Sequence, residues 1–329
     1  MTPHLSLFVY ESYRKLKAID PPLPSVFSSE AEAVVARSRH SLKLFEDTKR
    51  GIGGQLSYFR DEVSPAHAKA FLNNTWLPVA RFLETDLGFY SYDGKVITTT
   101  HAATFHLGVE PDALFQEGAG LHLQAIFQEY GSYLADLGAS FEPGRATFVS
   151  SLVPQRFDEW PNGVRSAKYY GRVFNGKATP DINRLLTVFR GMMNFVDSVI
   201  TAGMPADEIE YTVFKIRFLT LHQVLGSLYM LRDERSSDLT VQSMRFVKKI
   251  TDSPEAVLIM SLAAKPFRNT LMHYNLDSRV DTARVDVAQP LFGLVPIYFP
   301  SHDVTSLSEV VDGCIEATAA TLEEWATYY

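Results

Sequence analysis

The sequence predicts a mainly α-helical protein of two domains, a mixed α+β domain over residues 1–180 and a helical bundle over residues 181–329. Beyond Pro180, apolar residues recur at helical spacing in successive segments, several of which open with a capping residue or a proline. Before Pro180, helix-like segments alternate with a turn-and-strand pattern and an irregular, aromatic-rich stretch. The change of character near Pro180 therefore marks the expected domain boundary.

Residues 1–180 contain signals for both helices and strands. We predict helices over residues 29–60, from Ser64 to about Leu83, and over residues 111–138. The second of these would begin with Ser64 at the cap and Pro65 at the first helical position. Asp93-Gly94 predicts a turn between two short strands. The first part of the chain should therefore combine helices with a small sheet.

Residues 181–329 are predicted to form a bundle of helices. The predicted helices span residues 181–201, 205–235 and 239–250, a segment that starts at Ser253-Pro254, and residues 306–329. Asp181 and Ser253 are the expected caps of two of them, because their side-chain oxygens can accept hydrogen bonds from the free N–H groups of a first turn. Residues 281–300 are predicted to be strand or loop.

The composition limits the class of protein. Hydrophobic residues make up 46% and charged residues 21% of the 329 residues, which is ordinary for a globular chain. The net charge of −7 argues against non-specific coating of nucleic acid, because such binding needs many Lys and Arg side chains. Cys314 is the only cysteine, and no apolar run approaches the about 20 residues that cross a bilayer. We therefore expect a cytoplasmic protein without a membrane partner, a metal site or a cofactor.

One short segment carries residues suited to RNA cleavage, Arg268-Asn269-Thr270-Leu271-Met272-His273. A histidine, whose usual pKa is about 6.5, can accept and donate protons near neutral pH. A guanidinium can bind a phosphate with two parallel hydrogen bonds and stabilise added transition-state charge. RNA brings its own nucleophile, the 2′-hydroxyl, so such a site requires no metal. We therefore predict His273 as the proton-transfer group, Arg268 as the phosphate ligand and Asn269 as an orienting group.

Helical geometry restricts how these residues can cooperate. Five helical steps place Arg268 and His273 about 140° apart around the helix axis, whereas Asn269 and His273 share a face. A partner chain related by a two-fold axis would supply the complementary group, so we expect a homodimer. Pro266 predicts a kink or a new helix start. In the second case Arg268 would lie in the first turn, whose free N–H groups favour a phosphate.

The order of arginine, polar residue, three further residues and histidine, late in a small helical bundle, resembles the motif of the HEPN superfamily. The resemblance covers at most residues 181–329, and its specific part is residues 268–273. It implies a metal-independent endoribonuclease that dimerises, joins two motifs in one cleft, leaves a 2′,3′-cyclic phosphate and acts as a toxin or antiviral defence effector. It also implies an RNA substrate and an antitoxin or defence-system partner. Arg268, Asn269 and His273 would take the roles of the motif's three residues.

Two alternatives to an active ribonuclease stay open on the sequence alone. The bundle could be a catalytically inactive dimerisation or RNA-binding module of a defence or regulatory complex. Arg268 could also simply cap a kinked helix, with His273 as a core histidine. Residues 1–180 match no family that we recognise, and sensing, partner binding and substrate positioning are all possible roles for them.

Basic and aromatic residues just before the bundle form a second candidate RNA surface. Its members are Arg165, Lys168, Arg172, Tyr169 and Tyr170. Such residues can hold phosphates and stack bases. The alternative is a solvated connection between domains, with the aromatic side chains packed beneath it.

Two further residue pairs that contain histidine carry weaker signals. Arg60 and His67 fit the loosest spacing of the motif, but Ser64-Pro65 is expected to place them on separate helices. His101 and His106 have a spacing that suits neither a strand nor a helical metal pair. Neither pair is predicted to be functional.

Overall fold

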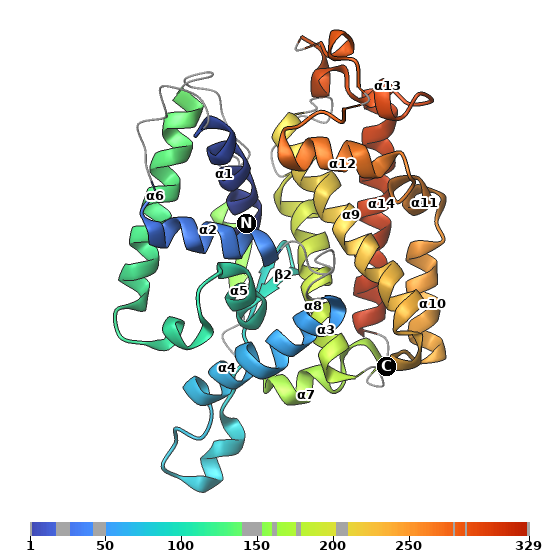
Figure 1. Cartoon of the computed structure of the whole chain (residues 1–329). Coiled ribbons are helices and arrows are strands. Elements are labelled where there is room, and N and C mark those ends of the chain that lie inside the picture. The colour runs from blue at the N-terminus through green and yellow to red at the C-terminus, as the bar shows by residue number, and fades with distance from the viewer. Residues whose placement is uncertain are drawn as a thin grey trace.

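The computed structural model describes residues 2–17, 27–41, 51–139, 153–159, 163–175, 179–201, 210–278, 280–286 and 288–327. The chain is mainly helical, as the sequence predicts, with one small three-stranded sheet in the described residues. None of the described helices is long and apolar enough to cross a membrane. Figure 1 shows the longest helices of the second half as one group, with the shorter helices of the first half beside them.

The first half of the chain contains both helices and the sheet. Its helices are α1 (Thr2–Leu16), α2 (Ser29–Ser41), α3 (Gly51–Tyr58), α4 (Ser64–Phe71), α5 (Thr100–Leu107), α6 (Ala119–Ala139) and α7 (Ser166–Tyr170). Strands β1 (Phe89–Tyr92), β2 (Lys95–Thr99) and β3 (Phe157–Glu159) are antiparallel, in the order β2-β1-β3. Asp93 and Gly94 turn the chain between β1 and β2 with positive φ angles, so the predicted hairpin is confirmed.

The second half consists of helices. They are α8 (Pro180–Asn194), α9 (Tyr211–Glu234), α10 (Val241–Thr251), α11 (Pro254–Ile259), α12 (Ala264–His273), α13 (Val295–Tyr298) and α14 (Val304–Thr327). Helices α8, α9 and α14 pack against one another, and α12 crosses the end of this group beside α1 (Figure 1). Ser253 caps α11 as predicted, with its hydroxyl 3.2 Å from the Ala256 N–H.

A single apolar core joins the sheet to the C-terminal helices. The core includes Phe89 and Val96 from the strands together with Phe189 and Leu228 from α8 and α9. Gly191 lets α8 approach β2 closely, because a Cβ at this position would lie only 2.7 Å from the carbonyl oxygen of Ile97. Side chains from both sides of residue 180 therefore share one core, and the predicted boundary there stays a prediction.

A second, smaller core lies among α1, α2 and α6. Val9, Val34 and Tyr133 are buried in it, and Phe27 packs on Tyr133 at a ring distance of 5.1 Å. Ser12 links α1 to α6 by a hydrogen bond of 2.9 Å to the Tyr133 hydroxyl. This core holds α1 in the place from which its charged side chains reach the C-terminal helices.

The prediction of a new helix at Ser64-Pro65 is wrong. Helices α3 and α4 are continuous through a π-helical turn (Phe59–Val63), and the Ser64 N–H donates to the Phe59 carbonyl instead of starting a helix. The wider π turn accommodates Pro65 because the proline ring then avoids the carbonyl that it would meet in a regular helix. Arg60 and the buried His67 thus lie on one continuous helical segment.

The helix predicted to reach Leu83 ends at Phe71. Asn73 adopts a left-handed backbone conformation, and the Glu84 carboxylate accepts hydrogen bonds from the N–H groups of Asn73 and Thr75, which closes the following segment into a loop. The apolar side chains of Trp76, Val79 and Leu83, which the predicted helix would have packed on one face, are consequently exposed by 68% to 84%. Figure 1 shows this segment projecting from the body of the molecule below α4.

Several element ends differ from the prediction. Thr179, rather than Asp181, occupies the cap position of α8, and Asp181 lies in the first turn, where its charge suits the helix dipole. Residues 111–115 form a 3₁₀ turn ahead of α6, and the described part of residues 281–300 consists of 3₁₀ turns and α13 without a strand. Residues 202–209, where a helix start was predicted, lie outside the described residues.

Candidate functional site at the end of α12

The predicted motif occupies helix α12, which is anchored by one apolar face. Phe267 and Leu271 are fully buried, and the Thr270 hydroxyl lies 2.8 Å from the Tyr298 hydroxyl of α13. Arg268 and His273 are partly exposed and Asn269 is exposed. Packing of α12 thus leaves all three motif residues accessible from outside the core.

The position of Pro266 differs from both predicted possibilities. Helix α12 begins at Ala264, two residues before the proline, so Pro266 lies in the first turn, where no backbone donor is needed. Arg268 falls in the second turn. The expectation that free N–H groups beside Arg268 would help to bind a phosphate is therefore wrong.

His273 ends α12 and contacts a carboxylate from the opposite end of the sequence. Tyr274 stops the helix by adopting a left-handed conformation, with φ 50° and ψ 35°. The His273 Nδ1 atom lies 3.2 Å from Oε2 of Glu11 in α1. The imidazole side chain is 36% exposed, whereas the Glu11 side chain is 4% exposed. A buried carboxylate therefore holds one ring nitrogen of a histidine whose side chain is partly exposed.

Two buried basic residues, Arg39 and Lys215, lie near Glu11 and His273. We call these four residues the charge cluster. Arg39 of α2 pairs with the second carboxylate oxygen of Glu11. Lys215 of α9 is 1% exposed, and its Nζ lies 3.6 Å from the centre of the Tyr274 ring. The Glu11 carboxylate thus contacts Arg39 and His273, and its charge also acts on the buried Lys215, so four helices contribute to the cluster.

The surroundings shift the protonation of two cluster members. Burial favours the neutral form of Glu11, but the hydrogen bond from His273 and the charge of Arg39 outweigh it, so the pKa of Glu11 is lowered. Burial lowers the pKa of Lys215 to about 7, although the Glu11 charge acts in the opposite direction. Glu11 is therefore an anion at neutral pH, while Lys215 can change charge near that pH.

Lys215 should make the protein more stable as the pH rises from 7 to about 10. Its pKa in the folded chain lies below the usual value of 10.5, so the unfolded chain binds more protons in this window and stability is lost as the pH falls towards 7. Urea denaturation from pH 7.5 to 9.5 should show a slope about 1.4 kcal/mol per pH unit steeper than in Lys215→Met. Exposed Lys249→Met is the control. Equal slopes in the wild type and Lys215→Met would contradict the buried position of the amine.

Arg268 has neighbours outside the charge cluster. One guanidinium nitrogen of Arg268 lies 4.0 Å from the Met272 sulfur, within the same helix. Burial lowers the pKa of His222 in α9, and the positive charge of Arg268 is the second largest cause of the shift. Arg268 therefore lies on the side of α12 that faces α9. Arg268 and His273 thus have different neighbours, as their angular separation on the helix predicts.

Exposed cations at the end of α1 lie beside His273. Arg14 and Lys15 occupy the last turn of α1 and are exposed. The Lys15 ammonium contacts the Asn275 side chain, two residues after His273. These cations were missed by sequence reasoning, because only the fold brings α1 against the end of α12. They add positive charge where a polyanionic ligand would approach the imidazole.

The second predicted RNA surface is only partly formed. Lys168 and Arg172 are exposed, but Tyr170 is 1% exposed and packs beneath the Arg184 guanidinium. Tyr169 is partly buried and packs on the Phe89 ring at 5.0 Å. Arg165 donates to the backbone carbonyls of residues 81 and 84. The tyrosines therefore support the sheet instead of offering faces for base stacking.

The other histidines singled out from the sequence, His67, His101 and His106, have structural partners. His67 and His101 lie 4.3 Å apart between ring centres, and their Nε2 atoms contact Thr104 and the backbone carbonyl of residue 86. His106 contacts Ser41. Among the described residues, no group of three or more His, Cys, Asp or Glu side chains is arranged to hold a metal ion.

Cys314 is buried in α14, and burial raises the pKa of its thiol to about 11. A thiol with this pKa stays protonated near neutral pH and is a poor nucleophile. The charge cluster and the motif on α12 are therefore the chemically richest part of the described structure.

Comparison with known proteins adds no relative to this picture. No family model matches the chain, and neither a curated protein nor a solved structure matches it. The functional inference consequently depends on the residues of α12 and on the groups that the fold places around His273.

Proposed function

We propose that this protein is a metal-independent endoribonuclease of the HEPN type, with a HEPN-like bundle after residue 180 and His273 as its proton-transfer group. The observation that carries the proposal is the partly exposed imidazole of His273 held by the buried Glu11 carboxylate, 3.2 Å away. A carboxylate on Nδ1 keeps a proton on that nitrogen and leaves Nε2 free to accept one. This pairing also orients the ring towards solvent, where an RNA strand can reach it.

The chemistry follows from these groups. Nε2 of His273 removes the proton of a ribose 2′-hydroxyl, and the oxygen attacks the adjacent phosphorus. The bond from phosphorus to the 5′-oxygen breaks, that oxygen takes up a proton, and the products are a 2′,3′-cyclic phosphate and a 5′-hydroxyl. The Glu11 carboxylate stabilises the imidazolium that forms in between. Arg14 and Lys15 would bind phosphates that flank the cleaved bond.

A second copy of the chain would complete the site. Arg268 faces α9 and does not share a helix face with His273, so one copy supplies only half of the proposed groups. A two-fold axis near α12 would bring Arg268 of the partner to the phosphate beside His273, with Asn269 as the orienting group. As the resemblance implies, such an enzyme would serve as a toxin or defence effector and would be held in check by a partner.

RNA cleavage by the purified full chain in EDTA tests this function. We expect single-stranded RNA to be cut, and His273→Ala and Arg268→Ala each to lower the rate at least about 100-fold, because each removes a group that acts in the transition state. The cleavage ends should carry a cyclic phosphate. The matched controls are His122→Ala and Arg60→Ala, which change exposed residues of the same types outside the site.

The controls are expected to cut RNA at the wild-type rate. Activity that survives both His273→Ala and Arg268→Ala, in chains whose circular dichroism is unchanged, would rule the assignment out. So would a wild-type chain that cuts no RNA. Glu11→Gln adds a positioning test, because it should shift the pH profile of cleavage even where the fold is intact.

One observation favours a second function, that of an inactive dimerisation or RNA-binding module. The Glu11 carboxylate pairs with His273 of α12 and with Arg39 of α2, and the whole purpose of such a cluster can be to fasten α1 and α2 to the bundle. In that case His273→Ala would lower the melting temperature, and the wild type would bind RNA without cutting it.

A further inference from the structure

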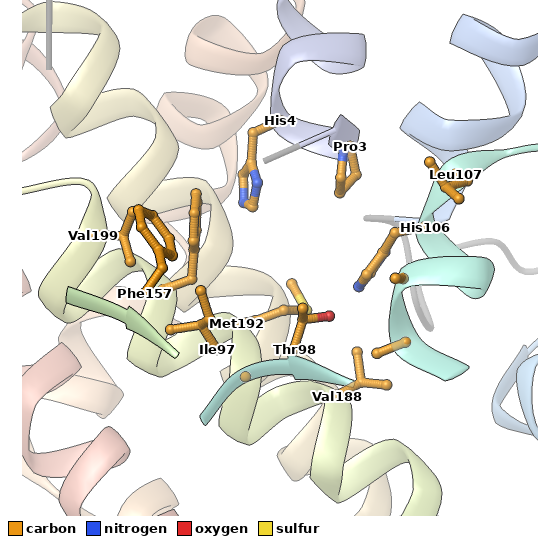
Figure 2. Close-up of a pocket in the computed structure, with 14 residues that line it drawn as sticks. Pro3, His4, Ile97, Thr98, His106, Leu107, Phe157, Val188, Met192 and Val199 are labelled. Atoms are coloured by element: carbon orange, nitrogen blue, oxygen red, sulfur yellow. The ribbon is translucent and has the colours of Figure 1, made fainter. Parts of the chain in front are cut away.

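A cavity of about 250 Å³ lies between the start of α1, strand β2 and helices α5 and α8. Figure 2 shows its lining, in which Ile97 and Met192 supply apolar walls. Phe195, at the end of α8, also lines it and stacks on the His4 ring at 5.5 Å. The cavity lies apart from the motif on α12 and has no role in the proposed cleavage.

Two histidines supply the main polar groups of this cavity. Figure 2 shows the rings of His4 and His106 directed towards the space between α1, β2 and α5. His4 Nε2 lies 2.9 Å from the Thr220 hydroxyl, while its Nδ1 is buried and finds no hydrogen-bond partner among the described residues. His4 itself is only 5% exposed. A buried polar atom without a partner is costly, so a ligand that hydrogen-bonds to it would bind favourably.

The cavity is built for an uncharged molecule. Among the described residues, no Asp, Glu, Lys or Arg side chain lines it, so an ion would enter without a counter-charge from a lining side chain. Burial lowers the pKa of His106 to about 3 and that of His4 well below its usual value, so both rings are neutral at pH 7. A carboxylate or an ammonium group would therefore be rejected.

The volume sets the size of the ligand. An apolar protein cavity of about 150 Å³ holds one benzene molecule. The additional volume of the present cavity has room for roughly one further ring. We propose that this cavity binds a neutral, flat molecule of two fused rings that carries one hydrogen-bonding nitrogen. Its rings would pack against Met192 and Phe195, and its nitrogen would bond to His4 or His106.

Calorimetric titration of the full chain with indole and quinoline tests this site. Indole offers an N–H donor and quinoline a nitrogen acceptor, which covers both tautomers of the histidines. We expect at least one to bind with a dissociation constant of about 1 mM or tighter, as suits a small ligand. Indene, which has two rings without nitrogen, should bind at least about tenfold more weakly, since it leaves the histidine unpaired. Indole-3-acetate should not bind.

A variant that fills the cavity identifies the site. Ala103 of α5 lines the cavity, and Ala103→Phe should weaken binding at least about tenfold by occupying the ligand's volume. Ala103→Leu replaces it if the larger side chain prevents folding. Ala135→Phe on the exposed face of α6 is the matched control and should leave the affinity unchanged. The proposal is overturned if neither indole nor quinoline binds, if the filled variants bind as well as the wild type, or if indole-3-acetate binds as tightly as indole.

Discussion

Replacing Glu11 by alanine should lower the free energy of unfolding by about 3–5 kcal/mol. The Glu11 side chain is 4% exposed and that of Arg39 is 6% exposed, so the substitution leaves a buried guanidinium without its counter-charge. The loss of the contact with His273 adds to the effect. Urea denaturation at pH 7 measures the change, which is a large part of the about 5–15 kcal/mol that typically stabilises a folded protein.

Two comparisons show that the cost arises from burial. The double variant Glu11→Met/Arg39→Met removes both charges and should recover most of the lost stability, because an apolar pair of similar volume replaces a buried ion pair with little loss. Glu110→Ala breaks the exposed pair with Arg37 and should cost less than about 1 kcal/mol. If Glu11→Ala cost no more than Glu110→Ala, the charge cluster would not be a buried element of the fold.

The protein should lose stability steeply as the pH falls from 6.5 to about 4. Burial lowers the pKa of five histidines in the folded chain, and these are His4, His67, His101, His106 and His222. The pKa reaches about 4 for His67 and about 3 for His101. The unfolded chain therefore binds more protons below pH 6.5, and each of these histidines should lower the free energy of unfolding by at most about 1.4 kcal/mol per pH unit between its usual pKa and its pKa in the folded chain.

Denaturant titrations at pH 7, 6, 5 and 4.5 measure this slope. His67→Gln keeps a polar group near Thr104 but cannot take up a proton, so its stability should fall less steeply than that of the wild type. His122→Gln changes an exposed histidine of α6 and should leave the slope as it is. A wild-type curve that is flat from pH 6.5 to 4.5 would show that the buried histidines are already protonated or exposed.

Local signals predicted the elements that local chemistry decides. Asp93 and Gly94 favour a tight turn wherever they occur between two β-forming segments, and the hairpin is present. Ser253 and Pro254 start α11 because a hydroxyl cap and a proline stabilise a first turn without help from the rest of the chain. The mainly helical character of the second half follows from apolar spacing of the same local kind.

The same reasoning failed where distant groups compete with local ones. Ser64 and Pro65 have the composition of a helix start, but a π turn carries the helix through them and packs the buried Phe59 and Val63 into the core. Trp76 lies on no helix, because the Glu84 carboxylate takes the N–H groups that would extend α4. In both places a contact from outside the local segment outweighs a local preference.

At the candidate site, the residue types and their angular separation on the helix could be predicted from the sequence. It predicted His273, Arg268 and Asn269 as a proton-transfer group, a phosphate ligand and an orienting group, and it placed the first two on different faces of one helix. The folded chain adds the contacts that the sequence did not predict: Glu11 holds the imidazole, Arg39 pairs with the carboxylate, and Lys215 is buried against the Tyr274 ring. These contacts join helices that are far apart in the sequence, so no local pattern predicts them. Charges interact strongly only where they are buried, and these residues become buried only when the helices pack together.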